Sequence, residues 1–214
     1  STLSIEELLD VVCGIDAVNN AQRYIRKIRQ LEMPSSSLDP YYDALVWLSP
    51  LKAAIESCID AKGTVYDNAS EGLALVRTKI GANRRKIDEK MQSLLRSEAA
   101  KLTDSIITIR NGRLVLPVRA EYKNSFKGII HDQSASMGTV FIEPMGCVEL
   151  NNLTAELALK EAEEIEKILS RLSGMVGADA EILKANAAIM TTLDVIFAKA
   201  KYAVAIFGIR PELT

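Results

Sequence analysis

The stretch from Ile106 to Pro144 departs from the helix-type pattern that fills the rest of the chain. Short runs rich in β-branched residues fill it, and Asn111-Gly112 separates the first two runs. Asn-Gly in this setting is the strongest short-range signal for a β-hairpin, because a type I′ turn requires positive φ at both central residues. The sequence therefore predicts a compact block of strands inserted between two helical regions.

Four strands are expected in this block, over residues 106–110, 113–119, 128–133 and 139–143, with Pro144 ending the last one. The small residues from Ser134 to Gly138 are typical of a turn between the third and fourth strands. Pro117 cannot donate a ladder hydrogen bond, so it predicts an edge position or a bulge in the second strand.

Helical signals fill the N-terminal flank. Ser4 followed by Glu7 is a capping box, and the helix that it opens is expected to end at Met33-Pro34. Asp39-Pro40 and Ser49-Pro50 each predict an N-cap with proline at the first helical position, hence two short helices. The run Gly63 to Tyr66 is typical of a connector or a short extended piece.

Two long helices are expected on either side of the strand block. The first begins at Ser70 and runs to about Asp104, which at 1.5 Å per residue gives about 50 Å. The second begins near Cys147 and has a similar length, so the two helices can lie antiparallel with the strand block at their far end. A last helix is expected over residues 179–207, after a loosening or break at Gly174 and Gly177.

The two long helices carry opposite charge. Residues 77–101 include eight basic and three acidic residues, whereas residues 149–171 include six glutamates and three basic residues. Opposite signs can set the pairing and register of an antiparallel coiled coil. Alternatively, the spare positive charge, above all at Arg84, Arg85 and Lys86, faces phosphate. Charge runs on helices are usually solvated faces, which favours the first interpretation, and both can hold together.

Bulk composition excludes several classes of protein. The net charge of −2 produces no global field toward nucleic acid or membrane, so any basic surface must be local. The three cysteines are far apart and form no C-x-x-C motif, so we expect neither a zinc site nor a disulfide framework, and a reducing compartment is favoured. No signal peptide and no bilayer-spanning apolar run is recognised, so no membrane partner is expected.

Few residues suggest catalysis. No phosphate-loop motif is present, and Ser134 and Ser136 have no recognisable base. His131 precedes Asp132, but adjacent residues of a strand point to opposite faces, so the two do not form a dyad by themselves. A structural hydrogen bond of His131 within the strand block, or a contact with a polar partner, is the favoured interpretation. We therefore predict no catalytic residue and no metal ligand.

The strand block has a modest surplus of positive charge, with five basic residues against three acidic ones. Backbone contacts with nucleic acid need clustered Lys or Arg, although charged residues also protect sheet edges from aggregation. The candidate nucleic-acid contacts are Arg110, Arg113, Arg119, Lys123 and Lys127, together with His131 and Gln133.

Five runs within Ile106 to Asn152 resemble the MutS-type-two family, the bacterial MutS paralogues outside conventional mismatch repair. These runs are Ile-Arg-Asn-Gly-Arg, Leu-Pro-Val-Arg-Ala-Glu-Tyr, Gly-Ile-Ile-His-Asp-Gln-Ser-Ala-Ser, Phe-Ile-Glu-Pro and Val-Glu-Leu-Asn-Asn. The flanks agree at Asp67-Asn68-Ala69-Ser70 and from Phe197 to Tyr202, so the resemblance covers most of the chain. Its most specific part is the His-Asp-Gln-Ser block.

The resemblance implies a mainly α fold with a small inserted antiparallel β subdomain. It assigns residues 1–105 to a helical core and outgoing lever helix, 106–146 to a four-stranded β clamp, and 147–214 to the returning lever helix and core. Family members match the clamp at Arg110, Arg113, Arg119, Tyr122, His131, Asp132 and Gln133. We transfer to these positions only their place in a clamp, without a catalytic role.

The resemblance also implies a cytoplasmic homodimer whose clamps close around nucleic acid. The family is associated with branched DNA and suppression of recombination, and in some bacteria with rescue of collided ribosomes. An ATPase domain, with its ATP and magnesium, and often a Smr nuclease domain would belong to the parent protein. We expect this segment to bind no cofactor, to be no enzyme and to be monomeric or weakly associated by itself.

Three functional hypotheses follow. The segment grips branched or double-stranded DNA, or it is a structural lever that contacts a ribosome or rRNA, or it is an enzyme in its own right. The third hypothesis needs a cleft with perturbed titratable groups.

Overall fold

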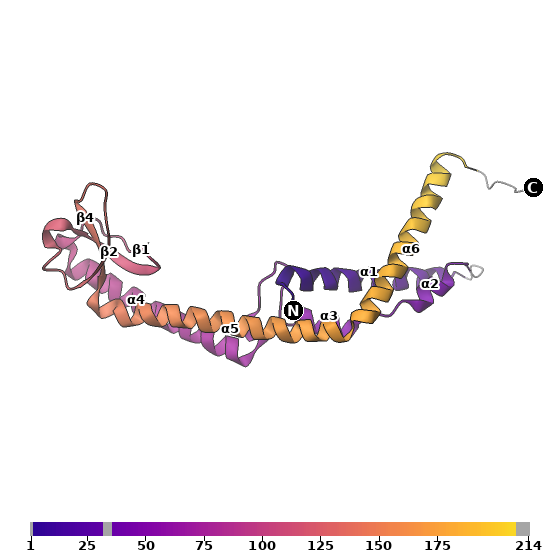
Figure 1. Cartoon of the computed structure of the whole chain (residues 1–214), viewed down its shortest axis with the longest axis horizontal. Helices are drawn as coiled ribbons and strands as arrows, with labels where there is room; N and C mark the ends of the chain where they lie inside the picture. The colour runs from indigo at the N-terminus through magenta and orange to yellow at the C-terminus, as the bar shows by residue number, and fades with distance from the viewer. Residues whose placement is uncertain (1, 32–35, 209–214) are drawn as a thin grey trace, which may run out of the picture. The chain divides into compact units, whose positions relative to one another are not determined.

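The computed structural model describes residues 2–31 and 36–208. They divide into two compact units, one drawn from residues 1–69 and 166–214 and the other from residues 70–165. Within the described residues helices predominate, and the strands form one four-stranded antiparallel sheet (Figure 1). The predicted mainly α fold with a small antiparallel β subdomain is confirmed.

The first unit begins with α1 (Ile5–Arg29), opened by the predicted capping box. The Ser4 hydroxyl accepts from the Glu7 backbone N–H at 3.2 Å, and the Ser4 N–H donates to the Glu7 carboxylate at 2.8 Å. These bonds satisfy two backbone donors that a helix start leaves unpaired. The expected stop at Met33-Pro34 lies outside the described residues.

The predicted N-caps of the two short helices are wrong. Leu38 caps α2 (Asp39–Ala44) and Leu48 caps α3 (Ser49–Glu56), without side-chain hydrogen bonds, so each proline occupies the second helical position. This position suits proline because N–H groups in the first turn have no helical acceptor. The Asp39 carboxylate instead accepts from the Ser36 N–H at 3.0 Å.

The connector over residues 63–66 leads from a tight turn that begins at Asp60 to the short 3₁₀ helix η1 (Asp67–Ala69). Ile59 and Val65 form an antiparallel bridge across this turn, and Gly63 has φ of 82°. That backbone conformation favours glycine.

The core of the first unit lies where α1 packs against α2, α3 and α6 (Ala180–Ala205). Leu8, Ile15, Leu51 and Ile55 are almost completely buried there. Asn186 of α6 is also buried, and its amide accepts from the Val46 N–H at 3.0 Å and donates to the Val46 carbonyl at 2.7 Å. One side chain thus satisfies both backbone groups of a residue between α2 and α3.

The helix α5 (Val148–Ala178) contributes residues to both units. It continues through Gly174 and Gly177, so the predicted break falls just beyond them, at Asp179. The last helix ends at Ala205, slightly before the expected Phe207.

The second unit begins with α4 (Glu71–Ser97), where the Ser70 hydroxyl accepts from the Leu73 N–H at 3.0 Å. The prediction that this helix runs to about Asp104 is wrong. Ala99–Lys101 form the 3₁₀ helix η2, the buried Leu102 bridges Val118, and the Thr103 N–H donates to the Pro117 carbonyl at 2.9 Å. Pairing with the sheet therefore replaces helical hydrogen bonds after Ser97.

Contacts between α4 and the first part of α5 show that the two helices are antiparallel (Figure 1). Arg77 pairs with Glu161 at 2.7 Å, whereas Asn83, farther along α4, donates to the Leu150 carbonyl and the Thr154 hydroxyl at 2.9 Å each. The strand block follows α4 and precedes α5, which places it at the predicted end of the pair.

The sheet has the order β1-β2-β4-β3 and contains β1 (Thr108–Arg110), β2 (Arg113–Arg119), β3 (Gly128–Gln133) and β4 (Thr139–Pro144). The predicted hairpin turn is confirmed, with φ of 49° at Asn111 and 74° at Gly112. β1 is shorter than predicted, and Pro117 lies in β2 beyond the part that β1 pairs with. The missing proline donor thus interrupts no pairing with β1.

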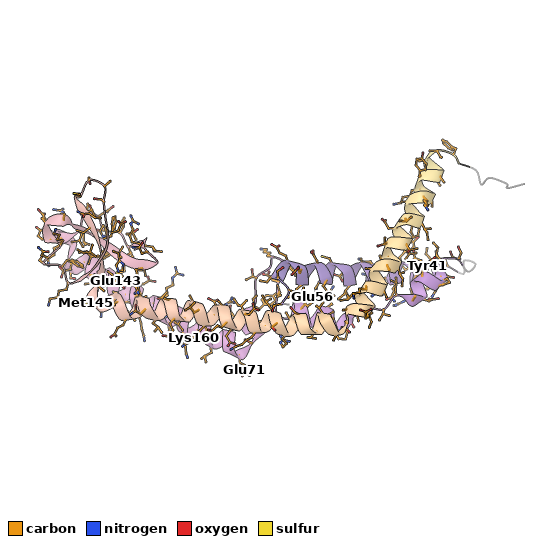
Figure 2. The ribbon with its side chains drawn as sticks, viewed as in Figure 1. Tyr41, Glu56, Glu71, Glu143, Met145 and Lys160 are labelled. Carbon is orange, nitrogen blue, oxygen red and sulfur yellow. The ribbon has the colours of Figure 1, made fainter. Side chains whose placement is uncertain are left out.

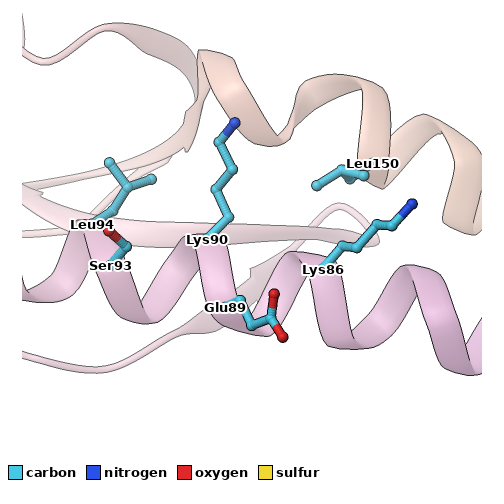
Figure 3. A pocket seen from close by; sticks show the side chains of 6 residues that line it. All are labelled: Lys86, Glu89, Lys90, Ser93, Leu94 and Leu150. Atoms are coloured by element: carbon cyan, nitrogen blue, oxygen red, sulfur yellow. The ribbon is translucent and has the colours of Figure 1, made fainter.

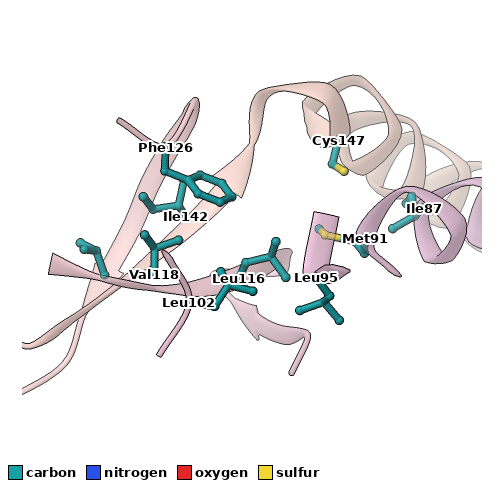
Figure 4. Close-up of a cluster of buried hydrophobic side chains, with 10 residues drawn as sticks. Ile87, Met91, Leu95, Leu102, Leu116, Val118, Phe126, Ile142 and Cys147 are labelled. Carbon is teal, nitrogen blue, oxygen red and sulfur yellow. The ribbon is translucent and has the colours of Figure 1, made fainter. Parts of the chain in front are cut away.

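One face of the sheet packs on α4 (Figure 4). Side chains of β2 and β4, including Leu116, Val118 and Ile142, contact a cluster that includes Ile87 and Met91 of α4. All five are at most 2% exposed. This cluster fixes the strand block on the end of the helix pair.

Candidate nucleic-acid interface

A buried carboxylate organises the polar residues of the strand block. The side chain of Glu143, on β4, is 1% exposed (Figure 2). Its Oε1 atom accepts from Arg113 Nη1 at 3.2 Å and from Asn151 Nδ2 at 2.8 Å, and its Oε2 atom lies 2.6 Å from His131 Nε2. Because a buried charge requires partners, this network is a structural element of the fold.

The strand register brings these groups together. The ladder between β3 and β4 shifts between Ile130 and Asp132, so His131 occupies an irregular position. The expected hydrogen bond of His131 within the strand block is present, and its partner is Glu143. Sequence reasoning missed Glu143 and Asn151, because the two residues meet His131 and Arg113 only through the sheet and the start of α5.

Arg110 is likewise engaged within the strand block. Its Nε atom lies 3.1 Å from Asp132 Oδ2, and its guanidinium carbon lies 4.0 Å from the centroid of the Phe141 ring. It also donates to the Ile109 carbonyl at 2.8 Å. An arginine that pairs with a carboxylate and stacks on a ring is held in a fixed orientation.

Arg119 and Gln133 are exposed, but each has a backbone partner. Arg119 Nε donates to the Leu102 carbonyl at 3.1 Å, and Gln133 Nε2 donates to the Met137 carbonyl at 3.3 Å. These bonds leave part of each polar head group available to solvent.

Lys123 and Lys127 differ from the arginines of the strand block. Both are exposed, and within residues 2–31 and 36–208 neither ammonium group has a hydrogen bond or an ion pair. Lys123 follows the short 3₁₀ helix η3 (Ala120–Tyr122), and Lys127 immediately precedes β3. Their charge is therefore uncompensated by contacts with the described part of the chain.

Arg84, Arg85 and Lys86 on α4 are also exposed and unpaired among the described residues. Of the predicted complementarity between the helices, the pair Arg77–Glu161 is observed directly. The opposite charges thus contribute to pairing of the two helices, while a separate set of cations on α4 faces solvent.

The serines of the strand block and the cysteine after it have structural surroundings. The hydroxyl oxygens of Ser134 and Ser136 lie 3.3 Å apart, and the Ser134 hydroxyl accepts from the Thr139 N–H at 3.1 Å. These contacts are typical of a turn. Burial raises the pKa of the Cys147 thiol, which opposes formation of a reactive thiolate. Among the described residues, no group of three His, Cys, Asp or Glu side chains is placed to hold a metal ion.

In the part of the chain that the structure describes, every helix is too short or too polar to span a bilayer.

An antiparallel helix pair that carries a small sheet, with paired arginines and unpaired lysines, defines a helical protein with an inserted β subdomain. No family model matches the chain. The chain is 43% identical over 214 residues to Endonuclease MutS2 of Geobacillus sp. strain WCH70, covering 99% of this chain and 27% of that relative. It is 41% identical over 213 residues to the proteins of the same name from Bacillus cereus strain B4264 and Bacillus anthracis.

The resemblance to the MutS2 family found in the sequence is thus confirmed. The chain spans about a quarter of the length of the curated relatives that it matches. The resemblance rests on a match along nearly the whole chain, which includes both the helices and the strand block.

Proposed function

We propose that this chain is the helical core and clamp segment of a MutS-like ATPase and that it grips the backbone of branched or double-stranded DNA. The observation that carries the proposal is the division of its basic residues into two groups. The strand arginines have internal partners, whereas Lys123, Lys127 and three cations of α4 have none among the described residues, namely Arg84, Arg85 and Lys86.

Unpaired, exposed cations suit phosphate binding. Each ammonium or guanidinium group that meets a phosphate releases condensed counterions, so affinity comes from charge and falls as salt rises. Such contacts position a protein on nucleic acid without reading its sequence. A binder of branched or duplex DNA that is not specific for sequence needs this kind of contact.

The paired arginines have a supporting role in this proposal. Arg110 and Arg113 keep the strand block folded through Asp132 and Glu143, and Arg119 ties β2 to Leu102. They remain candidates for DNA contact, because a guanidinium has five donors and these contacts use only some of them.

A ribosome or rRNA is the alternative partner, since the same lysines would contact RNA phosphate. The helix pair would then transmit motion from an ATPase domain of the parent protein to the ribosome. ATP and magnesium binding, the endonuclease activity in the name of the relatives, homodimerisation and a cytoplasmic location are proposed for the parent protein. The segment itself is proposed to act without catalysis.

The test is an electrophoretic mobility series with a Holliday junction, linear duplex DNA and ribosomes at several salt concentrations. The chain should shift both DNAs at low salt, with the affinity falling as salt rises. Replacement of Lys123 and Lys127 together by Ala should weaken the shift, provided that circular dichroism shows a folded protein. Salt-sensitive binding to ribosomes with no DNA shift would favour the alternative.

A further inference from the structure

Two hollows that share lining residues lie along α4, within the second unit. The first has a volume of about 510 Å³ and is lined by α4 residues and Leu150 of α5. The second, of about 420 Å³, extends to Lys127 and to the corner between β4 and α5. Lys90 and Leu94 line both hollows, and the two together are called the junction groove.

Lysines dominate the charge of the junction groove. Lys86, Lys90 and Lys127 line it, and among the described residues none of their ammonium groups has an ion pair or hydrogen bond. Lys101 also lines it but is neutralised by Glu98 at 2.7 Å. Glu89 is the remaining acidic side chain in the lining, so three free ammonium groups face one carboxylate.

The lysines on α4 point into this groove. Lys86 and Lys90 are one helical turn apart, which places their Cβ atoms about 5–6 Å from each other. In Figure 3 both side chains rise from α4 toward α5, and the Leu150 side chain lies between their ends. Two positive charges thus lie on either side of Leu150 in the first hollow.

The end of Lys90 passes close to the backbone of Gly146. A Cβ atom at Gly146 would lie 2.7 Å from Lys90 Cε and 3.0 Å from its Nζ, so the lysine crosses the corner where a side chain is absent. The adjacent Cys147 is buried and has a raised pKa, and it therefore offers no counter-charge. The Lys90 ammonium group therefore lies at this corner without an ion pair among the described residues.

The apolar part of the lining distinguishes the groove from a site for a small free anion. Leu94, Leu150 and Met145 contribute apolar surface between the ammonium groups, and Met145 is 58% exposed. A phosphodiester strand alternates charged phosphates with less polar sugars, which matches this lining. Lysine is a common point-charge ligand of phosphate.

We propose that the junction groove binds one strand of a nucleic-acid backbone through Lys86, Lys90 and Lys127. This inference rests on the proposed function and assigns its principal contact to the junction of α4 with the strand block. The other exposed basic residues of the strand block then have a secondary role in binding. Glu89 and the pair Lys101–Glu98 reduce the net positive charge of the groove. Binding therefore needs a polyanion long enough to contact all three lysines at once.

The test compares duplex binding across a salt series for the wild-type chain and a variant with Lys86→Gln, Lys90→Gln and Lys127→Gln. The variant should bind roughly tenfold more weakly at low salt, and its log–log salt slope should be shallower by about 2.7, or about 0.9 per lost phosphate contact. A control with Lys27→Gln, Lys199→Gln and Lys201→Gln removes the same charge from the first unit and should keep the wild-type slope.

Gly146→Ala is a second variant that leaves the charge unchanged. The added methyl group must displace the flexible end of Lys90, so the slope should become shallower by about 0.9 while the thermal midpoint stays unchanged. Wild-type binding and slope in both the triple variant and Gly146→Ala would overturn the junction groove and leave the proposed function intact.

If the wild-type chain does not change the electrophoretic mobility of duplex DNA, the proposed function fails. The junction groove is then tested by a separate measurement. Nuclear magnetic resonance would follow the Gly146 amide during titration with a short single-stranded oligothymidylate. A shift of that amide supports the groove, and its absence overturns it. An equal shift with a polyglutamate peptide of the same charge would also overturn the assignment to phosphodiester.

Discussion

The Nε2 atom of His131 lies 2.6 Å from Oε2 of Glu143, a carboxylate that is 1% exposed. Arg113 and Asn151 contact the other oxygen of this carboxylate, so one side chain joins β2, β3, β4 and α5. The histidine that is most conspicuous in the sequence therefore belongs to the internal structure of the strand block. The same is true of Arg113.

Replacement of Glu143 tests this network. Glu143→Gln keeps the shape but removes the charge that Arg113 and His131 face, and it should lower the free energy of unfolding by about 1.5–3 kcal/mol. Chemical unfolding measures this change. Glu149→Gln, at an exposed position on α5, should change the free energy of unfolding by less than about 0.5 kcal/mol. Equal effects of the two substitutions would contradict a structural role of the network.

Gly128 allows close contact between β3 and β4. A Cβ atom there would lie 2.3 Å from the Glu143 carbonyl oxygen and 2.4 Å from Ile142 Cγ2. Gly128→Ala should therefore destabilise the chain by about 1–3 kcal/mol, because the backbone must move. Gly138→Ala meets its nearest atom only at 3.7 Å and should have a small effect or stabilise slightly. Thermal unfolding compares the two, and an unaffected Gly128→Ala would show that the strands separate easily.

Asn83 links α4 to α5 at a buried position. Its amide nitrogen donates to Leu150 and Thr154, whereas its Oδ1 atom has no hydrogen-bond partner among the described residues. Asn83→Ala should cost about 1–3 kcal/mol, since it removes both bonds across the pair. Thr78→Ala, on an exposed part of the same helix, is the control and should stay within about 0.5 kcal/mol. Urea unfolding that does not distinguish the two would remove Asn83 as a link between the helices.

Asp60 should make the first unit sensitive to acid. The Thr64 and Lys62 N–H groups donate to its Oδ1 atom at 2.8 Å each, and the bond from Thr64 is the main cause of the lowered pKa of Asp60. A carboxyl group with a lowered folded pKa stabilises the fold above its unfolded value of about 3.9 and loses that contribution as pH falls through the folded pKa. Stability should therefore decline as the solution becomes acidic.

Asp60→Asn should remove this part of the pH dependence. Urea midpoints measured from about pH 6 to about pH 2.5 should fall less steeply for Asp60→Asn than for the wild type. Asp10→Asn changes an exposed carboxylate and should reproduce the wild-type curve. Parallel curves for Asp60→Asn and the wild type would contradict the role given to Asp60.

Features set by a few adjacent residues could be predicted from the sequence. The turn at Asn111-Gly112 and the caps at Ser4 and Ser70 depend on local φ preferences and on hydrogen bonds within one turn of chain. The antiparallel helix pair also followed from apolar periodicity and from opposite charges.

Features set by distant contacts were missed. α4 ends at Ser97 because Leu102 and Thr103 pair with β2. No residue near Ser97 in the sequence indicates that pairing. In the sequence Glu143 is an ordinary polar residue of a predicted strand. Its contacts with Arg113 and His131 form only when the sheet is assembled. Lys90 had a detectable signal, since Lys86 and Lys90 are one helical turn apart, but the corner at Gly146 that completes the groove exists only in three dimensions.

The salt dependence of duplex DNA binding by the wild-type chain tests the central claim most directly. Three to five phosphate contacts by the unpaired cations should give a log–log slope between about −2.7 and −4.5. Binding that is absent, or that does not weaken as salt rises, in a chain whose circular dichroism shows intact helices would contradict the account.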